Sequence, residues 1–214
     1  PLKNVDLYCF HYVNPEAVKR NYPLNKAIGM NETGIMTSAR YVRQCWKTVL
    51  SGLALYNMLD YTYTMGCEDG SYNPLKSSPA YLGTSGDELR SGLKVVNDFI
   101  NSFDFIKMKP AMELLKYDIG INPEVYVFAQ KDEQYAVYQI DNQHSGYGYG
   151  CSLGLKASEG RYRVEIIDAP TGSLLYTYET ETEDGAVPVY WHSEKTYGEN
   201  NEVEFAVRVK RIHE

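Results

Sequence analysis

One stretch of the sequence places a carboxylate where it could act as a nucleophile or as an acid. Residues 28–63 read IGMNETGIMTSARYVRQCWKTVLSGLALYNMLDYTY, and Glu32 stands directly after an apolar run and before a Thr-Gly pair. A glutamate at the end of a buried strand contributes little to packing, because charged side chains are rarely buried. A carboxylate presented to solvent from that position could instead do chemistry. The question is therefore which elements would position Glu32.

The first 107 residues read as strands that alternate with helices. Residues 5–13 and 25–32 are short apolar runs typical of buried strands, and PEAVKRNYP between them suggests a short helix. Thr37 or Ser38 can cap a following helix with an apolar stripe, and residues 54–63 form a third apolar run. A capping box at Ser85 opens a further helix. Alternation of this kind predicts a parallel sheet.

Polar and aromatic side chains follow the ends of the three predicted strands. These ends fall at His11 and Tyr12, at Asn31 and Glu32, and at Asp60 and Tyr61. Because the carboxyl ends of parallel strands meet at one edge of a sheet, we expect a single polar rim there. Aromatic rings can stack on sugar rings, and carboxylates can serve as nucleophile and acid. The rim therefore suits sugar recognition and glycosidic cleavage.

Each of these residues also has a purely structural interpretation. Glu32 could be a residue favoured by the dipole at a helix N-terminus. His11 and Tyr12 could be a hydrogen-bonded histidine beside a core tyrosine. Asp60 could cap the loop after its strand, and Glu68 could belong to a plain turn before Gly70.

The pattern changes after Pro110, where short alternating runs with turn signals begin. The last of them alternates cleanly, with Val203, Phe205 and Val207 predicted to point inward. Such runs predict a small antiparallel β-sandwich over residues 119–214, and LLKYDIGINP at residues 114–123 is predicted to be a linker.

Residues 5–107 resemble the last third of a clan A glycoside hydrolase barrel of the cellulase-like kind. FHYVNP is similar to the sixth-strand His-x-Tyr region of that clan, although His11 and Tyr12 are adjacent here. KAIGMNETG is similar to the seventh strand, where the clan places its nucleophilic glutamate. ALYNMLDYTYTMGCEDG resembles the eighth strand and its loop in cellulase-like bacterial proteins, which often carry a small β domain after the barrel.

The resemblance implies an α/β plus all-β fold, with residues 1–110 as the C-terminal portion of a (β/α) barrel and residues 119–214 as an accessory β-sandwich. It implies a retaining glycoside hydrolase with Glu32 as nucleophile. His11 and Tyr12 would line the sugar site and orient Glu32, while Asn31, Asp60 and Tyr61 would belong to its rim. No cofactor and no metal are expected, and a secreted or periplasmic location is implied.

The chain is too short for the whole of such a barrel, which typically takes about 250 residues. The clan takes its general acid from the fourth strand, and retaining hydrolysis needs two carboxyl groups about 5 Å apart. The acid/base is therefore expected to be absent from this chain, and the chain alone to be inactive. A missing N-terminal barrel portion or another chain would complete the barrel, and the lack of a starting Met fits a piece of something longer.

Composition excludes some partners and leaves one alternative function open. From residue 129 onward there are 8 Lys and Arg against 15 Asp and Glu, while the first 128 residues balance, which argues against nucleic acid and anionic membranes. The four cysteines have no zinc-site spacing and suggest free buried thiols. The alternative is a non-catalytic carbohydrate-binding or structural module, for which the β domain offers Tyr176, Tyr178, Tyr190 and Trp191.

Overall fold

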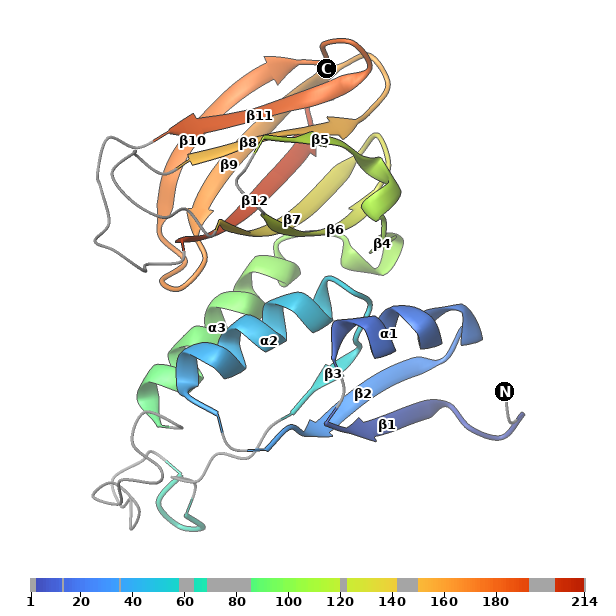
Figure 1. Cartoon of the computed structure of the whole chain (residues 1–214), viewed down its shortest axis with the longest axis vertical. Helices are drawn as coiled ribbons and strands as arrows, with labels where there is room; N and C mark the ends of the chain where they lie inside the picture. Colours follow the sequence, from blue (N-terminus) through green and yellow to red (C-terminus); the bar gives the residue numbers. More distant parts are fainter. Residues whose placement is uncertain are drawn as a thin grey trace. The chain divides into compact units, whose positions relative to one another are not determined.

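The computed structural model describes residues 3–12, 14–34, 36–57, 64–68, 86–119, 123–141, 150–192 and 203–213. The chain divides into two compact units, Pro1–Phe99 and Ile100–Glu214 (Figure 1). The first is an α/β unit and the second is built from antiparallel strands. The predicted mixed class is therefore confirmed, and the described residues contain no closed barrel.

The first unit contains a parallel sheet with strand order β1-β2-β3. Its elements are β1 (Leu7–His11), α1 (Pro15–Asn21), η1 (Tyr22–Leu24), β2 (Ala27–Glu32), α2 (Ser38–Val49), β3 (Leu55–Tyr56) and α3 (Asp87–Asn101). The predicted ends of the first two strands are thus close to the observed ones. The third strand is shorter than the predicted run at residues 54–63, and residues 58–63 lie outside the described residues.

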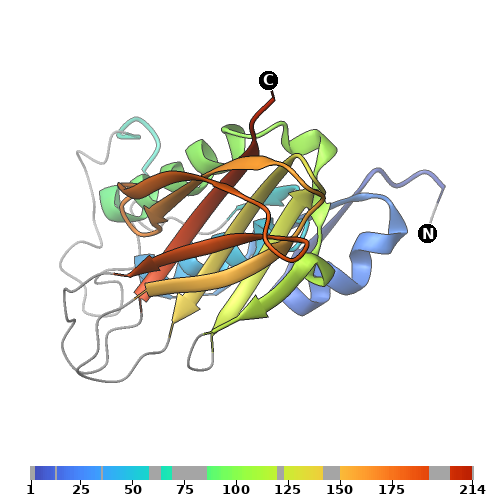
Figure 2. The ribbon, with the colours of Figure 1, turned by 90° about the horizontal axis from the view of Figure 1, so that it is seen from above.

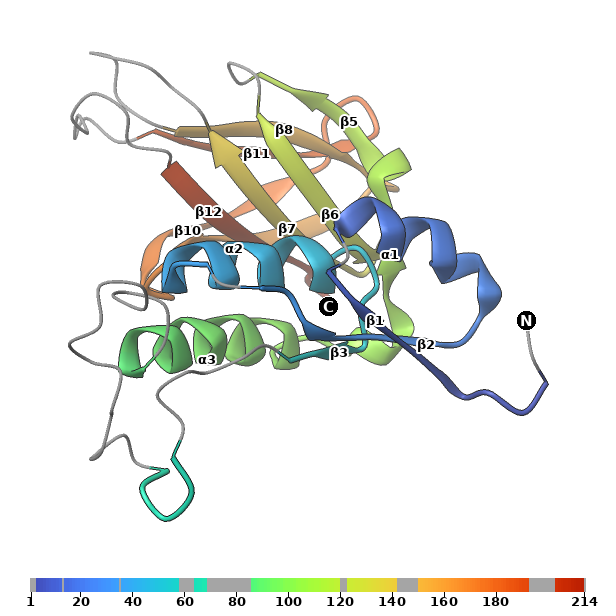
Figure 3. The same cartoon turned by 60° about the horizontal axis from the view of Figure 1, so that its bottom comes forward.

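Helices α1 and α2 lie on the same face of this sheet (Figure 3). Val18 of α1 forms a cluster of buried residues with Ile28, Met30 and Leu53, and α2 contributes buried Tyr41, Cys45 and Trp46 to the core of the unit. Of the two predicted caps of α2, Thr37 is the N-cap, because its side chain accepts a hydrogen bond from the amide of Arg40. Alternate residues of β2 therefore point to the helices, and the others point to the opposite face.

The opposite face of the parallel sheet is apolar and exposed. Leu7 on β1 and Leu55 on β3 are 43% and 45% exposed, and Cys9, also on β1, is exposed as well. A Cβ on Gly29 of β2 would lie 3.3–3.4 Å from atoms of these three side chains, so they adjoin one another. The expectation that every cysteine is buried is wrong for Cys9, whereas Cys45 and Cys151 are buried free thiols.

The second unit contains two antiparallel sheets that share one apolar core. The six-stranded sheet has the order β10-β9-β12-β7-β6-β4 and the three-stranded sheet has the order β11-β8-β5. Figure 2 shows the strands of this unit from above. The strands are β4 (Lys109–Pro110), β5 (Leu115–Asp118), β6 (Glu124–Gln130), β7 (Gln134–Asp141), β8 (Gly150–Lys156), β9 (Arg161–Asp168), β10 (Leu174–Glu181), β11 (Ala186–His192) and β12 (Val203–Arg211). Two short 3-10 helices, η3 (Phe105–Lys107) and η4 (Met112–Leu114), flank β4.

The shared core is formed by residues that alternate along the strands. Val203, Phe205 and Val207 of β12 point into it, as the alternation predicts, together with Leu153 and Leu155 of β8. Trp191 packs against Phe205 with ring centroids 5.4 Å apart. Each sheet therefore buries one face against the other.

The predicted linker is partly a strand. Leu115–Asp118 pairs antiparallel with β8, so β5 is an integral edge of the three-stranded sheet. Its four residues are too few to show a clear alternation, and the pairing partner lies far along the chain. The division between the units also falls before residue 110, at Phe99 and Ile100. No described helix has the length and apolar character that crossing a bilayer requires.

Candidate active site

The site begins with an irregularity in the pairing of β1 with β2. Phe10 pairs with Met30, but the next residue of β1, His11, pairs with Glu32, so Asn31 is an extra residue on β2. A register shift of one residue turns the following side chains to the other face. The bulge therefore brings Glu32 opposite His11 at the carboxyl edge of the two strands.

Tyr12 holds the Glu32 carboxylate from the neighbouring strand. Its hydroxyl donates a short hydrogen bond to Glu32 Oε1, and its amide donates to the Glu32 carbonyl at 2.8 Å. Tyr12 adopts a left-handed backbone conformation, with φ of 54°. A side chain in this region costs about 1–2 kcal/mol, which the two bonds to Glu32 offset.

Gly34 provides the space for the Tyr12 ring. Its φ is 75°, a conformation that favours glycine, and a Cβ there would lie 3.3 Å from Tyr12 Cε1. The sequence E-T-G after β2 thus has two structural consequences. The strand β2 ends at Glu32, and Gly34, which has no side chain, leaves room for the Tyr12 ring.

His11 completes the contacts to the carboxylate. Its Nδ1 lies 3.5 Å from Glu32 Oε2, and the His11 and Tyr12 ring centroids are 6.2 Å apart. The side chain of Glu32 is 30% exposed and that of His11 is 53% exposed. Each oxygen of the carboxylate therefore has its own neighbour, and the group remains accessible to a ligand.

The loop after Glu32 is fastened to α2 by residues that sequence reasoning did not single out. Thr33 Oγ1 donates to Gln44 Oε1 at 2.8 Å, and the Tyr41 hydroxyl donates a short bond to the Gly34 carbonyl. The Tyr56 hydroxyl on β3 donates to the Tyr41 carbonyl at 2.9 Å and approaches Gln44 Oε1 at 3.2 Å. Burial raises the pKa of Tyr56, so its hydroxyl keeps the proton that makes these bonds.

The remaining predicted rim residues contribute less, or lie outside the described residues. Asn31 is on the bulge, and its Oδ1 is buried and accepts no hydrogen bond from any described residue. Asp60 and Tyr61 lie outside the described residues. The structure thus brings His11, Tyr12 and Glu32 together and leaves the predicted roles of Asp60 and Tyr61 as predictions.

Among the described ends of the three parallel strands, Glu32 carries the only carboxylate. The segments that follow β1, β2 and β3 carry His11 and Tyr12, then Glu32 and Thr33, then Asn57. Glu68 forms a local turn, in which its carboxylate accepts from the amide of Gly66 at 2.8 Å. The turn interpretation of Glu68 therefore has direct support. In the described part of the chain, no group of three His, Cys, Asp or Glu side chains could hold a metal ion.

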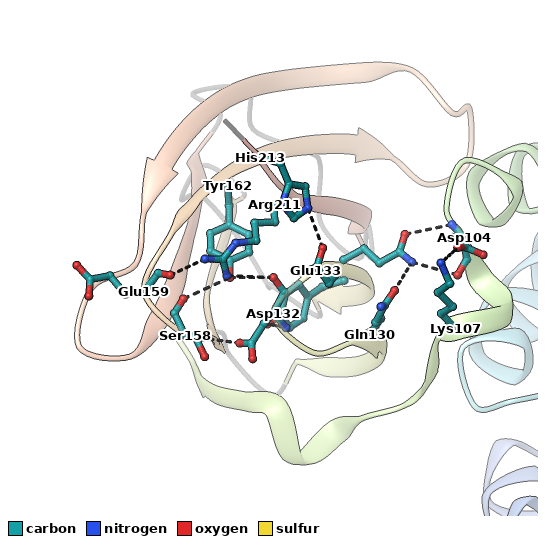
Figure 4. A network of polar contacts seen from close by, with 12 residues as sticks. Asp104, Lys107, Gln130, Asp132, Glu133, Ser158, Glu159, Tyr162, Arg211 and His213 are labelled. Carbon is teal, nitrogen blue, oxygen red and sulfur yellow. Dashed lines mark hydrogen bonds and ion pairs between the residues drawn. The ribbon is translucent and has the colours of Figure 1, made fainter.

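A second polar cluster, in the second unit, is structural in character (Figure 4). A pocket of about 320 Å³ is lined by Gly160, Arg161, Arg211, Ile212 and His213. Arg211 donates to the carbonyls of Asp132 and Glu159 and to the Tyr162 hydroxyl. Arg161 pairs with Glu179, and His213 pairs with Glu133. Arg211 and His213 thus join two turns to the end of β12 and the residues after it, and Arg161 links β9 to β10.

Comparison with known proteins gives a likeness in structure alone. No protein-family model and no curated protein matches the sequence. A solved structure described as a glycoside hydrolase superposes with a TM-score of 0.63 at 10% identity, over 92% of this chain and 45% of that chain. A GH30 endoxylanase from Clostridium papyrosolvens gives a TM-score of 0.53 at 10% identity, over 98% of this chain and 50% of that chain.

The chain therefore has a glycoside hydrolase-like fold, and it spans about half the length of the solved structures that it matches. At this level of identity the likeness concerns the fold, not the chemistry. It agrees with the mixed, glycoside hydrolase-like fold that the sequence resemblance implies, and the barrel segment and the sandwich stay predictions.

Proposed function

We propose that this chain is the C-terminal part of a retaining glycoside hydrolase, in which Glu32 is the nucleophile and the acid/base comes from another polypeptide segment. The observation that carries this proposal is the Glu32 carboxylate at the carboxyl edge of two parallel strands, contacted by Tyr12 on one oxygen and His11 on the other. Functional groups of parallel β/α folds lie at this edge.

The reaction assigns a separate task to each group. A Glu32 oxygen attacks the anomeric carbon, and the glycosidic oxygen leaves with the bonding electron pair and a proton from the acid. Water, deprotonated by the same acid/base, then attacks the anomeric carbon and releases the Glu32 carboxylate. Tyr12 and His11 position the carboxylate for the first step. A sugar ring would approach from the exposed side of His11 and Tyr12.

The exposed face of the parallel sheet supports completion by a further segment. Leu7, Cys9 and Leu55 form an apolar surface, and the outer edges of β1 and β3 are open to pairing in the described sheet. Asn31 Oδ1 is a buried acceptor that lacks a donor among the described residues. A barrel portion, in the same parent chain or a separate one, would cover this face and pair these edges. Residues 1–110 would then be its last strands and helices, and residues 119–214 its β-sandwich accessory domain.

A chain with the nucleophile but without the acid/base has a distinctive reactivity, which provides the test. Ordinary aryl glycosides, whose leaving groups need a proton, should not be hydrolysed by the chain alone. Dinitrophenolate is a leaving group that needs no proton, so dinitrophenyl glycosides should react with Glu32 to form the glycosyl-enzyme. This intermediate then accumulates, because no base activates water. Azide needs no base and should release a glycosyl azide with the configuration of the substrate.

The outcomes separate the parts of the proposal. Hydrolysis of ordinary aryl glycosides that disappears in Glu32→Gln would show that an acid/base is present in this chain after all. Absence of azide-dependent release from xylosides, glucosides and mannosides alike would contradict the proposed nucleophile. Since glycosidases that degrade polysaccharides meet their substrates outside the cell, the proposal includes a secreted or periplasmic location.

Tyr12→Phe should slow azide-dependent release about 10-fold or more. The substitution removes the hydroxyl that donates to Glu32 Oε1, and a hydrogen bond to a charged group contributes about 1.5–3 kcal/mol. The measurement is the rate of dinitrophenolate release in the presence of azide. Tyr22→Phe is the matched control, because Tyr22 is a partly exposed tyrosine of η1, and it should leave the rate unchanged. An unchanged rate in Tyr12→Phe would remove Tyr12 from the positioning role.

A further inference from the structure

The outer face of the three-stranded sheet in the second unit carries aromatic residues around a floor of small ones. Leu153 and Leu155 of the central strand β8 point into the core, so Ser152 and Gly154 face away from it. Gly154 pairs with Pro188 of β11 on one side and with Tyr117 of β5 on the other. This row therefore has a glycine between a proline and a tyrosine.

The next row of the same face repeats the arrangement. Ser152 pairs with Tyr190 of β11, and its carbonyl accepts from the amide of Ile119 at 2.9 Å. Tyr190 is 64% exposed and Ile119 is 74% exposed. We call the surface formed by Tyr117, Ile119, Ser152, Gly154, Pro188 and Tyr190 the outer-sheet platform.

The Tyr117 ring lies directly on the floor of the platform. A Cβ on Gly154 would come within 2.3 Å of Tyr117 Cε1, so only glycine lets the ring lie against the sheet there. Tyr117 nevertheless remains 40% exposed. A ring that rests on backbone and keeps an exposed face is a fixed surface on which a second flat ring can stack.

Tyr178 fixes the strand that carries Pro188 and Tyr190. Its hydroxyl accepts from the Tyr190 amide at 2.8 Å and donates to the Pro188 carbonyl at 3.2 Å. Burial raises the pKa of Tyr178 to about 12, so the hydroxyl remains protonated at neutral pH. This bonding occupies two backbone polar groups of β11, the edge strand of the sheet. Tyr190 is therefore presented from a rigid backbone, which lowers the entropy that a ligand must offset.

The charge and size of the platform limit what it can bind. Its six residues are uncharged, and Lys156, the next outward residue of β8, donates to the Glu113 carbonyl at 2.8 Å. By strand spacing and rise, three strands over four residues cover about 200 Å². A stable protein interface buries about 800 Å² on each partner, so the platform is too small for a second copy of the chain.

From this geometry we propose that the outer-sheet platform binds a neutral polysaccharide chain, with sugar rings stacked on Tyr117 and Tyr190 and hydroxyl groups near Ser152. The ligand class rests on the proposed glycoside hydrolase function. The platform and the candidate active site share no residue, since all six platform residues belong to the second unit and Glu32 belongs to the first. The platform would hold a polymer without cleaving it.

Native gel electrophoresis of the whole chain tests the platform directly. Soluble xylan, mixed-linkage β-glucan and glucomannan are each cast in a gel, and migration is compared with a gel that lacks polysaccharide. We expect at least one polymer to retard the wild-type chain. Tyr190→Ala should weaken the binding about 10-fold, and the double variant with Tyr117→Ala should abolish the retardation. Tyr22→Ala, a partly exposed tyrosine of the first unit, is the matched control and should bind normally.

The outcomes distinguish this proposal from the proposed function. Glu32→Gln should be retarded by the polysaccharide as strongly as the wild type. If the wild-type chain shows no azide-dependent release but normal retardation, the assignment of Glu32 as nucleophile fails and the platform proposal stands. Retardation that persists in the double variant would place the binding elsewhere and overturn the platform. So would the absence of retardation with all three polymers. A dimer in sedimentation experiments that dissociates in Tyr190→Ala, whose fold is checked by thermal unfolding, would identify a second copy as the occupant and also overturn it.

Discussion

Glu32→Gln is expected to abolish the azide-dependent release of dinitrophenolate, with a loss on the order of 10⁴-fold or more. The amide keeps the shape of the side chain and can still accept the hydrogen bond from Tyr12. It cannot form the glycosyl ester, because a neutral amide oxygen is a poor nucleophile. The measurement is the azide-dependent rate at saturating dinitrophenyl glycoside.

The matched control is Glu16→Gln, which removes a carboxylate from α1 in the same unit. Glu16 pairs with Lys19 at 2.8 Å on the exposed surface, and that interaction holds the pKa of Glu16 below its usual value. We expect an unchanged rate in this variant. Equal losses in the two variants would mean that charge, not position, accounts for the effect.

Trp46→Ala should lower the free energy of unfolding of the first unit by about 3–5 kcal/mol. The Trp46 side chain is fully buried on α2, and its ring meets the edge of Phe99 with centroids 5.0 Å apart. Its truncation removes this aromatic pair and leaves a cavity behind α2. Urea unfolding followed by far-ultraviolet circular dichroism measures the change.

The same substitution should also slow the reaction at Glu32. Helix α2 carries Tyr41 and Gln44, which fasten the loop after Glu32, so displacement of the helix loosens the carboxylate. Trp46→Phe retains most of the buried area and should cost roughly 1–2 kcal/mol. A loss below about 1 kcal/mol in Trp46→Ala would show that packing by Trp46 does not hold α2 in place.

Apolar periodicity was sufficient to place His11 and Glu32 at strand ends, because it locates where a buried run stops. His11 and Glu32 are indeed the last residues of their strands. The bulge at Asn31 and the left-handed Tyr12 could not be predicted in this way, since a change of one residue in register leaves the apolar pattern intact. The bonds of Tyr41 and Gln44 to the loop after Glu32 could not be predicted either, because a position on a helix does not show which backbone groups its side chain contacts.

Long-range pairing was the other feature beyond the reach of sequence patterns. Leu115–Asp118 looked like a linker, yet it pairs with residues 153–155. The outer-sheet platform depends on this pairing, because Tyr117 and Tyr190 are brought together only by β8. Local signals in a chain, such as turns and alternations, do not specify which strands become neighbours.

The most direct test of the account is the site of covalent labelling by 2,4-dinitrophenyl 2-deoxy-2-fluoroglycosides. These reagents need no acid for the first step and form a long-lived ester with the attacking carboxylate. After digestion and tandem mass spectrometry, we predict a single fluoroglycosyl adduct on Glu32, and none in Glu32→Gln. An adduct on a different carboxylate, or an unlabelled Glu32 with xylosyl, glucosyl and mannosyl reagents alike, would contradict the assignment of Glu32 as nucleophile.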